Sequence, residues 1–463
     1  MEPKDLTQRL PEDALAAVLH RLPPHGLAAA RCVCKAWHAA IDARRMLDLF
    51  PPSLVGMFIN FFDLDISEFF FRPLRGMDTA VSGKLHYIPT DKSSVVDHCN
   101  GLLLLHKASY VVNPATRCWA PLPPPPPRFE HGCPWSDAAL RDHCYIVFDP
   151  AVSQHYEVVR IPSLPWRTTG SELQLEWPPS PFVMHVFSSA TGNWEERSFA
   201  RRGDSIGTVA HLQELEKWSV VPHLSAYWRG ELYVLTQFVM RISLSNNTYQ
   251  AIKPPVDVGM LDQELHLGKS KNGVYFACFD PQCRLRVWIL NKLHGETVWV
   301  LKHDNNLDYM LSHGRYDPQF QGPWIIEDIN YDSNHSPSPI EMKEVEDEFG
   351  WNSDNENTLD TRHGARNHYN GSISILGFHP YREVIFLNAS FRRGLAYNIN
   401  SSKLEDLGNI YPKNYSSMQM FVEHSFPYTP CWIGLSIGIA WAMCWSQGWK
   451  MKKCPRALCP LES

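Results

Sequence analysis

The sequence predicts an α+β multidomain protein, in which a small N-terminal three-helix domain is followed by a mainly-β domain of β-propeller type. Three observations support this prediction: an apolar helical stripe near the N-terminus, runs of strand-forming residues bounded by turn-formers, and a recurring polar turn. Aromatic residues make up 12% of the 463 residues and there are 36 prolines, which favours strands over a helical bundle.

The predicted helices lie between Leu10 and Ile41. Pro11 suits a first helical position, and acidic residues follow it in the first turn. An apolar stripe at helical spacing then comprises Leu15, Val18, Leu19 and Leu22. Pro23-Pro24 is predicted to end this helix, and a second is predicted to begin near His25, with a break near Lys35. The apolar face after the prolines comprises Leu27, Ala30, Cys34 and Trp37.

Three short helices bury little surface by themselves, so their apolar stripes need a partner or the rest of the chain. Periodicity alone leaves both interpretations open. Several short motifs occur here in a fixed order, and they are Leu10-Pro11, Leu22-Pro23 and Val33-Cys34-Lys35 followed by Trp37. In this combination residues 8–50 resemble an F-box.

The resemblance implies the substrate-recruiting subunit of an SCF-type (cullin-RING) ubiquitin ligase. Apolar side chains of the helices would dock on the SCF adaptor and, through it, reach the cullin. The adaptor-binding residues that the resemblance implies are Leu10, Pro11, Leu15, Val18, Leu19, Leu22, Pro23, Leu27, Val33, Cys34 and Trp37. The sequence does not separate docking from the packing of the helices on one another, at Trp37 above all.

Similar polar turns recur in the middle of the chain. They begin at Val112, Phe148 and Phe187, at intervals of 36 and 39 residues. Weaker copies occur at residues 245–249, at Asn291 and at Asn398. A repeat of about 40 residues with four short strands is the period of a propeller blade.

The segments around these turns alternate like strands and are rich in β-branched and aromatic residues. They include residues 145–148, 156–161, 230–237, 238–243, 249–252, 273–280 and 285–291. A blade cannot cover both of its faces, so blades must stack in a ring. An irregular β-sandwich whose turns are similar by chance is the alternative.

Residues 98–106, 110–119 and 121–123 also resemble the F-box-associated β-propeller-like domain of plant F-box proteins. This resemblance implies that the β domain recruits a protein substrate through loops on one face. Neither the substrate nor the residues that bind it are readable from the sequence.

The predicted domains are an F-box at 1–50, a linker or first strands at 51–94, the propeller-like domain at 95–424 and a C-terminal tail at 425–463. A polar, acidic stretch around 332–372 predicts a disordered insertion. The proline run 121–127 predicts a stiff loop between blades, with a polyproline ligand as the alternative. The apolar run 431–449 predicts either an element packed on the propeller, a membrane anchor or an atypical terminus.

The composition excludes several function classes. The net charge of −6 argues against nucleic-acid binding. The 12 cysteines form no zinc signature, and no signal peptide opens the chain, so we expect reduced thiols in the cytoplasm or nucleus and no metal. No nucleotide-binding or hydrolase motif occurs, so we expect no catalytic residue and no cofactor. The alternative function is a propeller binding protein or hydrolase whose N-terminal helices are only a structural cap.

Overall fold

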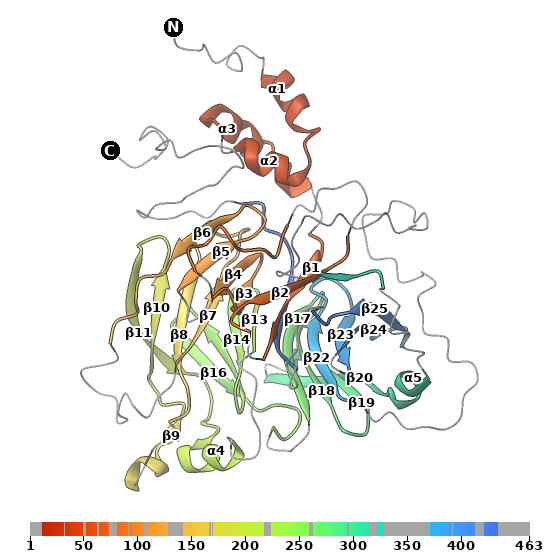
Figure 1. Cartoon of the computed structure of the whole chain (residues 1–463). Coiled ribbons are helices and arrows are strands. Elements are labelled where there is room, and N and C mark those ends of the chain that lie inside the picture. Colours follow the sequence, from red (N-terminus) through yellow and green to blue (C-terminus); the bar gives the residue numbers. More distant parts are fainter. Residues whose placement is uncertain are drawn as a thin grey trace.

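The computed structural model (Figure 1) places three short helices above a ring of strands. It describes residues 12–31, 33–49, 52–62, 64–73, 81–90, 92–105, 109–127, 142–165, 168, 170–216, 224–258, 263–293, 296–313, 322–327, 371–390, 392–412 and 421–433. The acidic stretch at 332–370 and the tail from residue 434 onward lie outside these ranges, so their predicted roles stay predictions. In the described residues no helix is long and apolar enough to cross a membrane.

The N-terminal helices follow the sequence pattern closely. They are α1 (Glu12–Leu19), α2 (Pro24–Arg31), α3 (Lys35–Ala43) and the 3-10 turn η2 (Met46–Leu49). α1 ends at Leu19, before the predicted stop at Pro23-Pro24, and α2 begins at Pro24, one residue before the predicted start near His25. A proline is tolerated in a first helical turn because its missing N–H would have no partner there.

The β domain consists of six four-stranded antiparallel units within the described residues. Blade 1 contains β26 (Val422–Tyr428), β1 (Gly56–Phe61), β2 (Ser67–Phe71) and β21 (Ile325–Glu327). Blade 2 contains β3 (Val95–Cys99), β4 (Leu102–Leu105), β5 (Tyr110–Asn113) and β6 (Cys118–Pro121). Blade 3 contains β7 (Asp142–Val147), β8 (Glu157–Pro162), β10 (Phe182–Ser188) and β11 (Asn193–Arg201).

The other three blades follow along the chain. Blade 4 contains β13 (Ser225–Trp228), β14 (Glu231–Leu235), β15 (Val239–Ser243) and β16 (Thr248–Ile252). Blade 5 contains β17 (Glu264–Ser270), β18 (Gly273–Phe279), β19 (Arg284–Leu293) and β20 (Glu296–Asn306). Blade 6 contains β22 (Ile373–Phe378), β23 (Val384–Ala389), β24 (Arg393–Asn398) and β25 (Leu404–Asn409).

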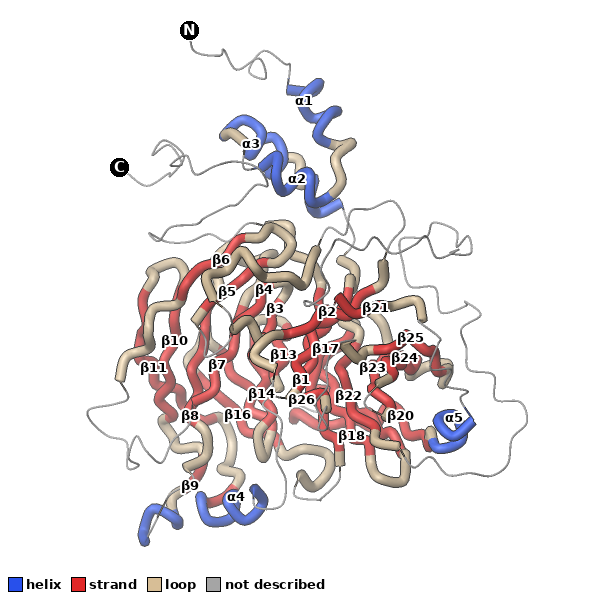
Figure 2. The backbone as a smooth tube through the Cα atoms, in the orientation of Figure 1, coloured by secondary structure: helices blue, strands red, loops and turns tan. Residues whose placement is uncertain are grey.

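A few short elements lie between the blades and at the edge of the ring (Figure 2). They are η5 (Gly170–Gln174), β9 (Glu176–Trp177), β12 (Gly207–Thr208), α4 (Val209–Glu216) and α5 (Asp308–His313). Blades 3 and 4 are also joined edge to edge, because β11 and β16 pair in parallel at Ala200↔Thr248 and Arg201↔Tyr249. This pairing merges the two blades into one eight-stranded sheet.

Apolar packing closes the ring. Each pair of neighbouring blades shares one buried apolar cluster, and the sixth such cluster joins blade 6 back to blade 1. In that cluster Met57 and Phe70 of blade 1 are buried with Val384 and Phe386 of blade 6. Both faces of every blade are therefore covered by a neighbour, which is the requirement that the strand pattern predicted. The predicted β-propeller-like domain is confirmed.

The ring is completed by strands from both ends of the β domain. β26 pairs with β1, so that Phe58 lies opposite Phe426. The predicted domain boundary between 424 and 425 falls inside this strand and is corrected, because the ring extends at least to Tyr428. The first strands expected within 51–94 are β1 and β2.

The recurring turn joins the third and fourth strands of a blade. Five positions after Val112 and after Phe187 the backbone is left-handed, with φ of 54° at Arg117 and 72° at Gly192. The equivalent turns of blades 4 and 6 have φ of 48° at Asn247 and 56° at Ser402. The turn after Phe148 instead joins β7 to β8, the first two strands of blade 3. The intervals of 36 and 39 residues are therefore not blade periods, although the turns at Val112 and Phe187 are equivalent.

The proline run lies against blade 3. The indole Nε1 of Trp194 donates a hydrogen bond to the Pro123 carbonyl at 2.9 Å, and Arg160 Nη1 donates to the Pro126 carbonyl at 2.9 Å. The segment connects β6 of blade 2 with β7 of blade 3, in agreement with the predicted loop between blades.

Candidate adaptor-binding site

The three N-terminal helices have an apolar core of their own. Its buried members are Leu15, Ala16, Leu19, Leu27, Ala30, Ala40, Ile41 and Met46, with Leu22, Trp37 and Leu47 packed against them. None of these residues belongs to a cluster of the propeller. The helices are therefore a separate packing unit that stands at one end of the ring (Figure 2).

Ion pairs link the helices to one another. The Arg31 guanidinium on α2 donates two hydrogen bonds to the Asp42 carboxylate on α3, at 2.7 and 2.8 Å. His38 Nε2 lies 3.0 Å from the same carboxylate. The Arg31 hydrogen bond lowers the pKa of Asp42, with a smaller contribution from His38. Arg44 reaches Asp13 on α1 at 2.7 Å. These partly exposed pairs fix the orientation of the helices more than they add stability.

The predicted adaptor-binding residues fall into three groups. Leu15, Leu19 and Leu27 are buried inside the helical core. Leu22, Cys34 and Trp37 are half-buried, and Val18, Pro23 and Val33 are exposed. Leu10 and Pro11 lie outside the described residues.

The exposed fractions show which of these side chains pack inside the helices and which a partner could reach. Val18 is 56% exposed and Val33 is 57% exposed, although both carry an apolar side chain. Trp37 packs against the helical core, and its buried Nε1 has no hydrogen-bond acceptor among the described residues. The surface available to a partner therefore includes Val18, Pro23 and Val33, together with the exposed parts of Leu22 and Cys34.

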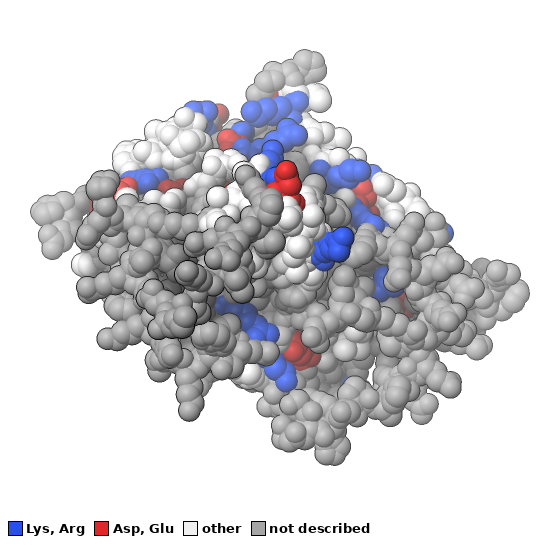
Figure 3. Space-filling view, turned by 90° about the horizontal axis from the view of Figure 1, so that it is seen from above, with Lys and Arg blue, Asp and Glu red and all other residues white. Residues whose placement is uncertain are grey.

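Several basic side chains lie at this end of the molecule. Figure 3 looks onto the end of the molecule that carries the helices, and lysine and arginine side chains gather there in several patches with fewer acidic groups. Arg21, Arg44 and Arg45 are exposed on or beside the helices. A partner with acidic groups on its docking face would complement this end of the chain.

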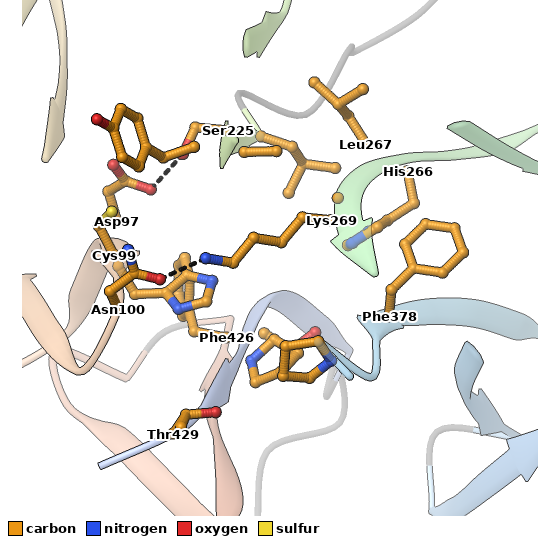
Figure 4. Close-up of a pocket in the computed structure, with 18 of the residues that line it drawn as sticks. Asp97, Cys99, Asn100, Ser225, His266, Leu267, Lys269, Phe378, Phe426 and Thr429 are labelled. Carbon is orange, nitrogen blue, oxygen red and sulfur yellow. Dashed lines mark hydrogen bonds between the residues drawn. The ribbon is translucent and has the colours of Figure 1, made fainter. Parts of the chain in front are cut away.

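A second candidate site is a pocket inside the ring. Its walls come from the first strands of blades 2, 4 and 5, from β26, and from the turn between β22 and β23. The cavity volume is about 60 Å³. Lys269 extends across it from β17, and its Nζ donates a hydrogen bond to Asn100 Oδ1 at 2.5 Å (Figure 4). Asn100 in turn donates to the Phe148 carbonyl at 2.7 Å, which fixes its amide.

Asp97 lies at the other side of this pocket, where three blades meet. Ser225 Oγ of blade 4 donates to its Oδ1, and the Ile146 amide of blade 3 donates to its Oδ2, each at 2.7 Å. Burial nevertheless raises the pKa of Asp97 to about 7. Burial lowers the pKa values of His98 and His266 to about 3, so both are neutral at pH 7.

The sequence did not single out this pocket. Lys269 follows Leu265 and Leu267 in an ordinary alternating strand, and only the ring places it opposite Asn100, which comes from a different blade. Residues 98–101 were noted for their resemblance alone. No local pattern could have identified the pair, because the two residues are 169 positions apart. The described residues contain no group of His, Cys, Asp or Glu that could hold a metal ion.

Comparison with known proteins assigns the N-terminal helices. The F-box domain matches residues 8–48. A putative F-box protein of Arabidopsis thaliana is 24% identical over 259 residues, which cover 54% of this chain and 62% of that protein. A putative F-box/kelch-repeat protein of Arabidopsis thaliana is 24% identical over 341 residues, covering 68% of this chain and 76% of that protein. The chain thus spans less than two thirds of the first of these relatives.

Two solved structures resemble the chain more distantly. One is the crystal structure of HIRA(644-1017), with 11% identity and a TM-score of 0.22, covering 58% of this chain and 57% of that one. The other is YCF48 bound to D1 peptide, with 9% identity and a TM-score of 0.32, covering 79% of this chain and 84% of that one. The fold assignment therefore rests on the strand topology. Residues 8–48 are an F-box domain, placed before a β-propeller-like domain, and two relatives of this chain are putative F-box proteins of Arabidopsis thaliana.

Proposed function

We propose that this chain is the substrate-recognition subunit of an SCF-type ubiquitin ligase. Its F-box helices dock on the SCF adaptor, and its propeller holds a protein substrate. The observation that carries the proposal is the separation of the two packing units: the helices have their own apolar core, and the six blades close on themselves. Such a division lets one end bind the ligase while the other binds the substrate.

The docking surface is small and apolar. Val18 and Val33 expose more than half of their side chains, and burying a valine fully contributes about 1.5–3 kcal/mol. A few central apolar anchors usually supply most of the binding energy of an interface. Exposed Arg21 beside this surface favours an acidic group on the partner. The helical core holds the helices that carry this surface in place, and its buried members include Leu15, Leu19 and Leu27.

The contribution of this chain to ubiquitin transfer is positional. A substrate held on the propeller is kept at a raised effective concentration near the transfer machinery, which supplies the chemistry. The chain itself needs no catalytic residue or cofactor for this role. Its place of action is the cytoplasm or the nucleus, where cullin ligases meet their substrates.

The rival role, in which the helices only cap the propeller, requires shared packing between them and the ring. Among the described residues, the apolar cluster of the helices shares no member with the apolar clusters of the propeller. A cap would also have little reason to keep Val18 and Val33 exposed.

The test is capture of purified SCF adaptor by the full-length chain. A double variant, Val18→Asp with Val33→Asp, places charges on the docking surface without touching the helical core. We expect it to lose at least tenfold in adaptor affinity, because a buried unpaired charge is strongly unfavourable. Val152→Asp is the matched control, since Val152 is 82% exposed on the propeller.

The outcome is decisive in either direction. Loss of adaptor capture in the double variant alone, with unchanged circular dichroism, supports the proposed role. Absence of capture by the folded wild-type chain, or equal capture by the double variant, contradicts it.

A further inference from the structure

The pocket inside the ring contains one ammonium group with unused hydrogen-bonding capacity. A lysine ammonium has three N–H donors, and Lys269 uses one of them on Asn100. Among the described residues no carboxylate oxygen lies within 4.0 Å of its Nζ. Burial lowers the pKa of Lys269, and the more distant Cys99 and Asp149 act in the opposite direction. An anion bound beside its Nζ would stabilise the protonated form. Lys269 is half-buried, and an ammonium group in such a place without an ion-pair partner is a candidate for binding an external anion.

The other groups of the pocket permit an anion. Both carboxyl oxygens of Asp97 already accept hydrogen bonds from neighbouring strands. His98 and His266 line the same space as neutral rings. Tyr381, 37% exposed, adds a hydroxyl beside that of Thr429 at the rim. Lys269 is therefore the one group on the described walls that is drawn toward a negative ligand by its charge (Figure 4).

The size of the cavity limits the ligand. One water needs about 10–15 Å³ of such volume, so about 60 Å³ holds roughly four to six atoms of that size. A drug-sized metabolite requires a pocket several times larger. A carboxylate on one or two methylene groups fits, which is the end of an aspartate or glutamate side chain.

We propose that Lys269, oriented by Asn100, forms a receptor for a single carboxylate group presented by an acidic side chain of the recruited protein. The identity of that protein as a ubiquitination substrate rests on the proposed function above. The carboxylate accepts hydrogen bonds from the two remaining N–H groups of Lys269, and Asn100 holds the ammonium in place. The methylene groups of the ligand lie against apolar wall residues such as Phe378 and Phe426.

The experiment is isothermal titration calorimetry on the purified full-length chain. The probes are N-acetyl-glutamate methylamide, its glutamine counterpart as a neutral isostere, and propionate as a free small acid. We expect saturable binding of the glutamate probe and at least tenfold weaker binding of the glutamine probe. A glutamate probe that binds more tightly than propionate supports a protein side chain as the source, whereas equal affinities would overturn that part of the proposal.

Two variants test the residue itself. Lys269→Met keeps the aliphatic stem and removes the charge, and we expect at least a tenfold loss of affinity for the glutamate probe. Lys403→Met is the matched control at an exposed lysine on blade 6, and it should bind like wild type. Equal binding by Lys269→Met and wild type, or no binding of either carboxylate at millimolar concentration by wild type, would overturn the proposal.

Folding and adaptor binding are monitored in the same samples. Lys269→Met should melt no lower than wild type, because replacing a buried charge by an apolar side chain is often neutral or stabilising. It should also capture the SCF adaptor normally, since the F-box helices are unchanged. A loss of carboxylate binding with adaptor capture intact thus concerns the pocket alone, and a failure of adaptor capture in wild type concerns the proposed function alone.

Discussion

At the scale of single residues, burial shifts the pKa values of several acids and bases of the ring. Asp97 receives hydrogen bonds from two other blades and has its pKa raised to about 7 by burial. His98, His266 and His379 have pKa values lowered to about 3 by burial. Opposite shifts of acids and bases have the same cause here, because burial disfavours the charged form of each.

These shifts predict how stability depends on pH. The raised pKa of Asp97 means that the folded state holds this proton more tightly than the unfolded state, so its stabilising contribution is lost as the pH rises through about 7. The pKa values of His98 and His266 are lower in the folded state than their unfolded value near 6.5. These histidines therefore reduce the stability of the fold as the pH falls below about 6.5. Burial also raises the pKa of Glu405 to about 7, so the contribution of Asp97 between pH 6.5 and 8 is isolated by comparison with a variant at that position.

We expect the free energy of unfolding of wild type to fall by about 1 kcal/mol more than that of Asp97→Asn between pH 6.5 and 8. Asparagine is neutral throughout and keeps most of the side-chain shape. Urea denaturation at several pH values measures this difference. Parallel curves for the two proteins would show that Asp97 does not take up a proton in this range.

A second prediction at the residue scale concerns the recurring turn. Gly192 has a left-handed backbone with φ of 72°. Gly192→Ala should lower the free energy of unfolding by about 1–2 kcal/mol, because a Cβ disfavours that conformation. Ala190→Ser, an exposed change in the same turn, should alter it by less than about 0.5 kcal/mol. Equal stability of the two variants would contradict this account of the turn.

At the scale of helices and strands, the sequence predicted the elements whose formation depends on neighbouring residues alone. Segments such as 230–237 and 273–280 form β14 and β18, because their β-branched and aromatic residues lie between turn-formers. The F-box helices follow from their apolar spacing. The pairing of β26 with β1 was not predicted, since it joins residues about 370 positions apart and Pro427 interrupts the strand signal.

The sequence predicted the residues of the candidate adaptor-binding site, but not which of them are exposed. The apolar stripe identified Leu15, Val18 and Leu19 together, but periodicity cannot show that Val18 alone of these three is exposed. That distinction depends on how α1 packs against α3, which is a tertiary property. Lys269 was missed for the same kind of reason, because its surroundings come from other blades.

The strand pairing that closes the ring makes a prediction of its own. Phe426 is 6% exposed and is buried with Phe58 and Phe69. Phe426→Ala should lower the free energy of unfolding by about 3–5 kcal/mol, since it leaves a cavity where blades 1 and 2 meet. Phe421 lies just before the same strand, is 41% exposed and stacks on Phe62, so Phe421→Ala should have a much smaller effect. Comparable losses in chemical denaturation would contradict the assignment of β26 as the closing strand.

At the scale of the whole molecule, the chain consists of two packing units, to which we assign different roles. The helices carry the exposed apolar residues that we propose dock on the adaptor, and the ring carries the pocket that we propose binds a carboxylate. Because the ring is closed by its own strands, removal of residues 1–50 should leave it folded with a similar melting temperature. The proposed function requires both units in one molecule.

The measurement that tests this most directly is co-purification of recombinant SCF adaptor and cullin with the full-length chain and with a chain lacking residues 1–50. The account predicts that the full-length chain brings down both proteins and that the shortened chain brings down neither, while its circular dichroism and melting still report a folded β domain. Unfolding of the shortened chain would favour the helices as a structural cap. Failure of the folded full-length chain to retain the adaptor would contradict the ligase role.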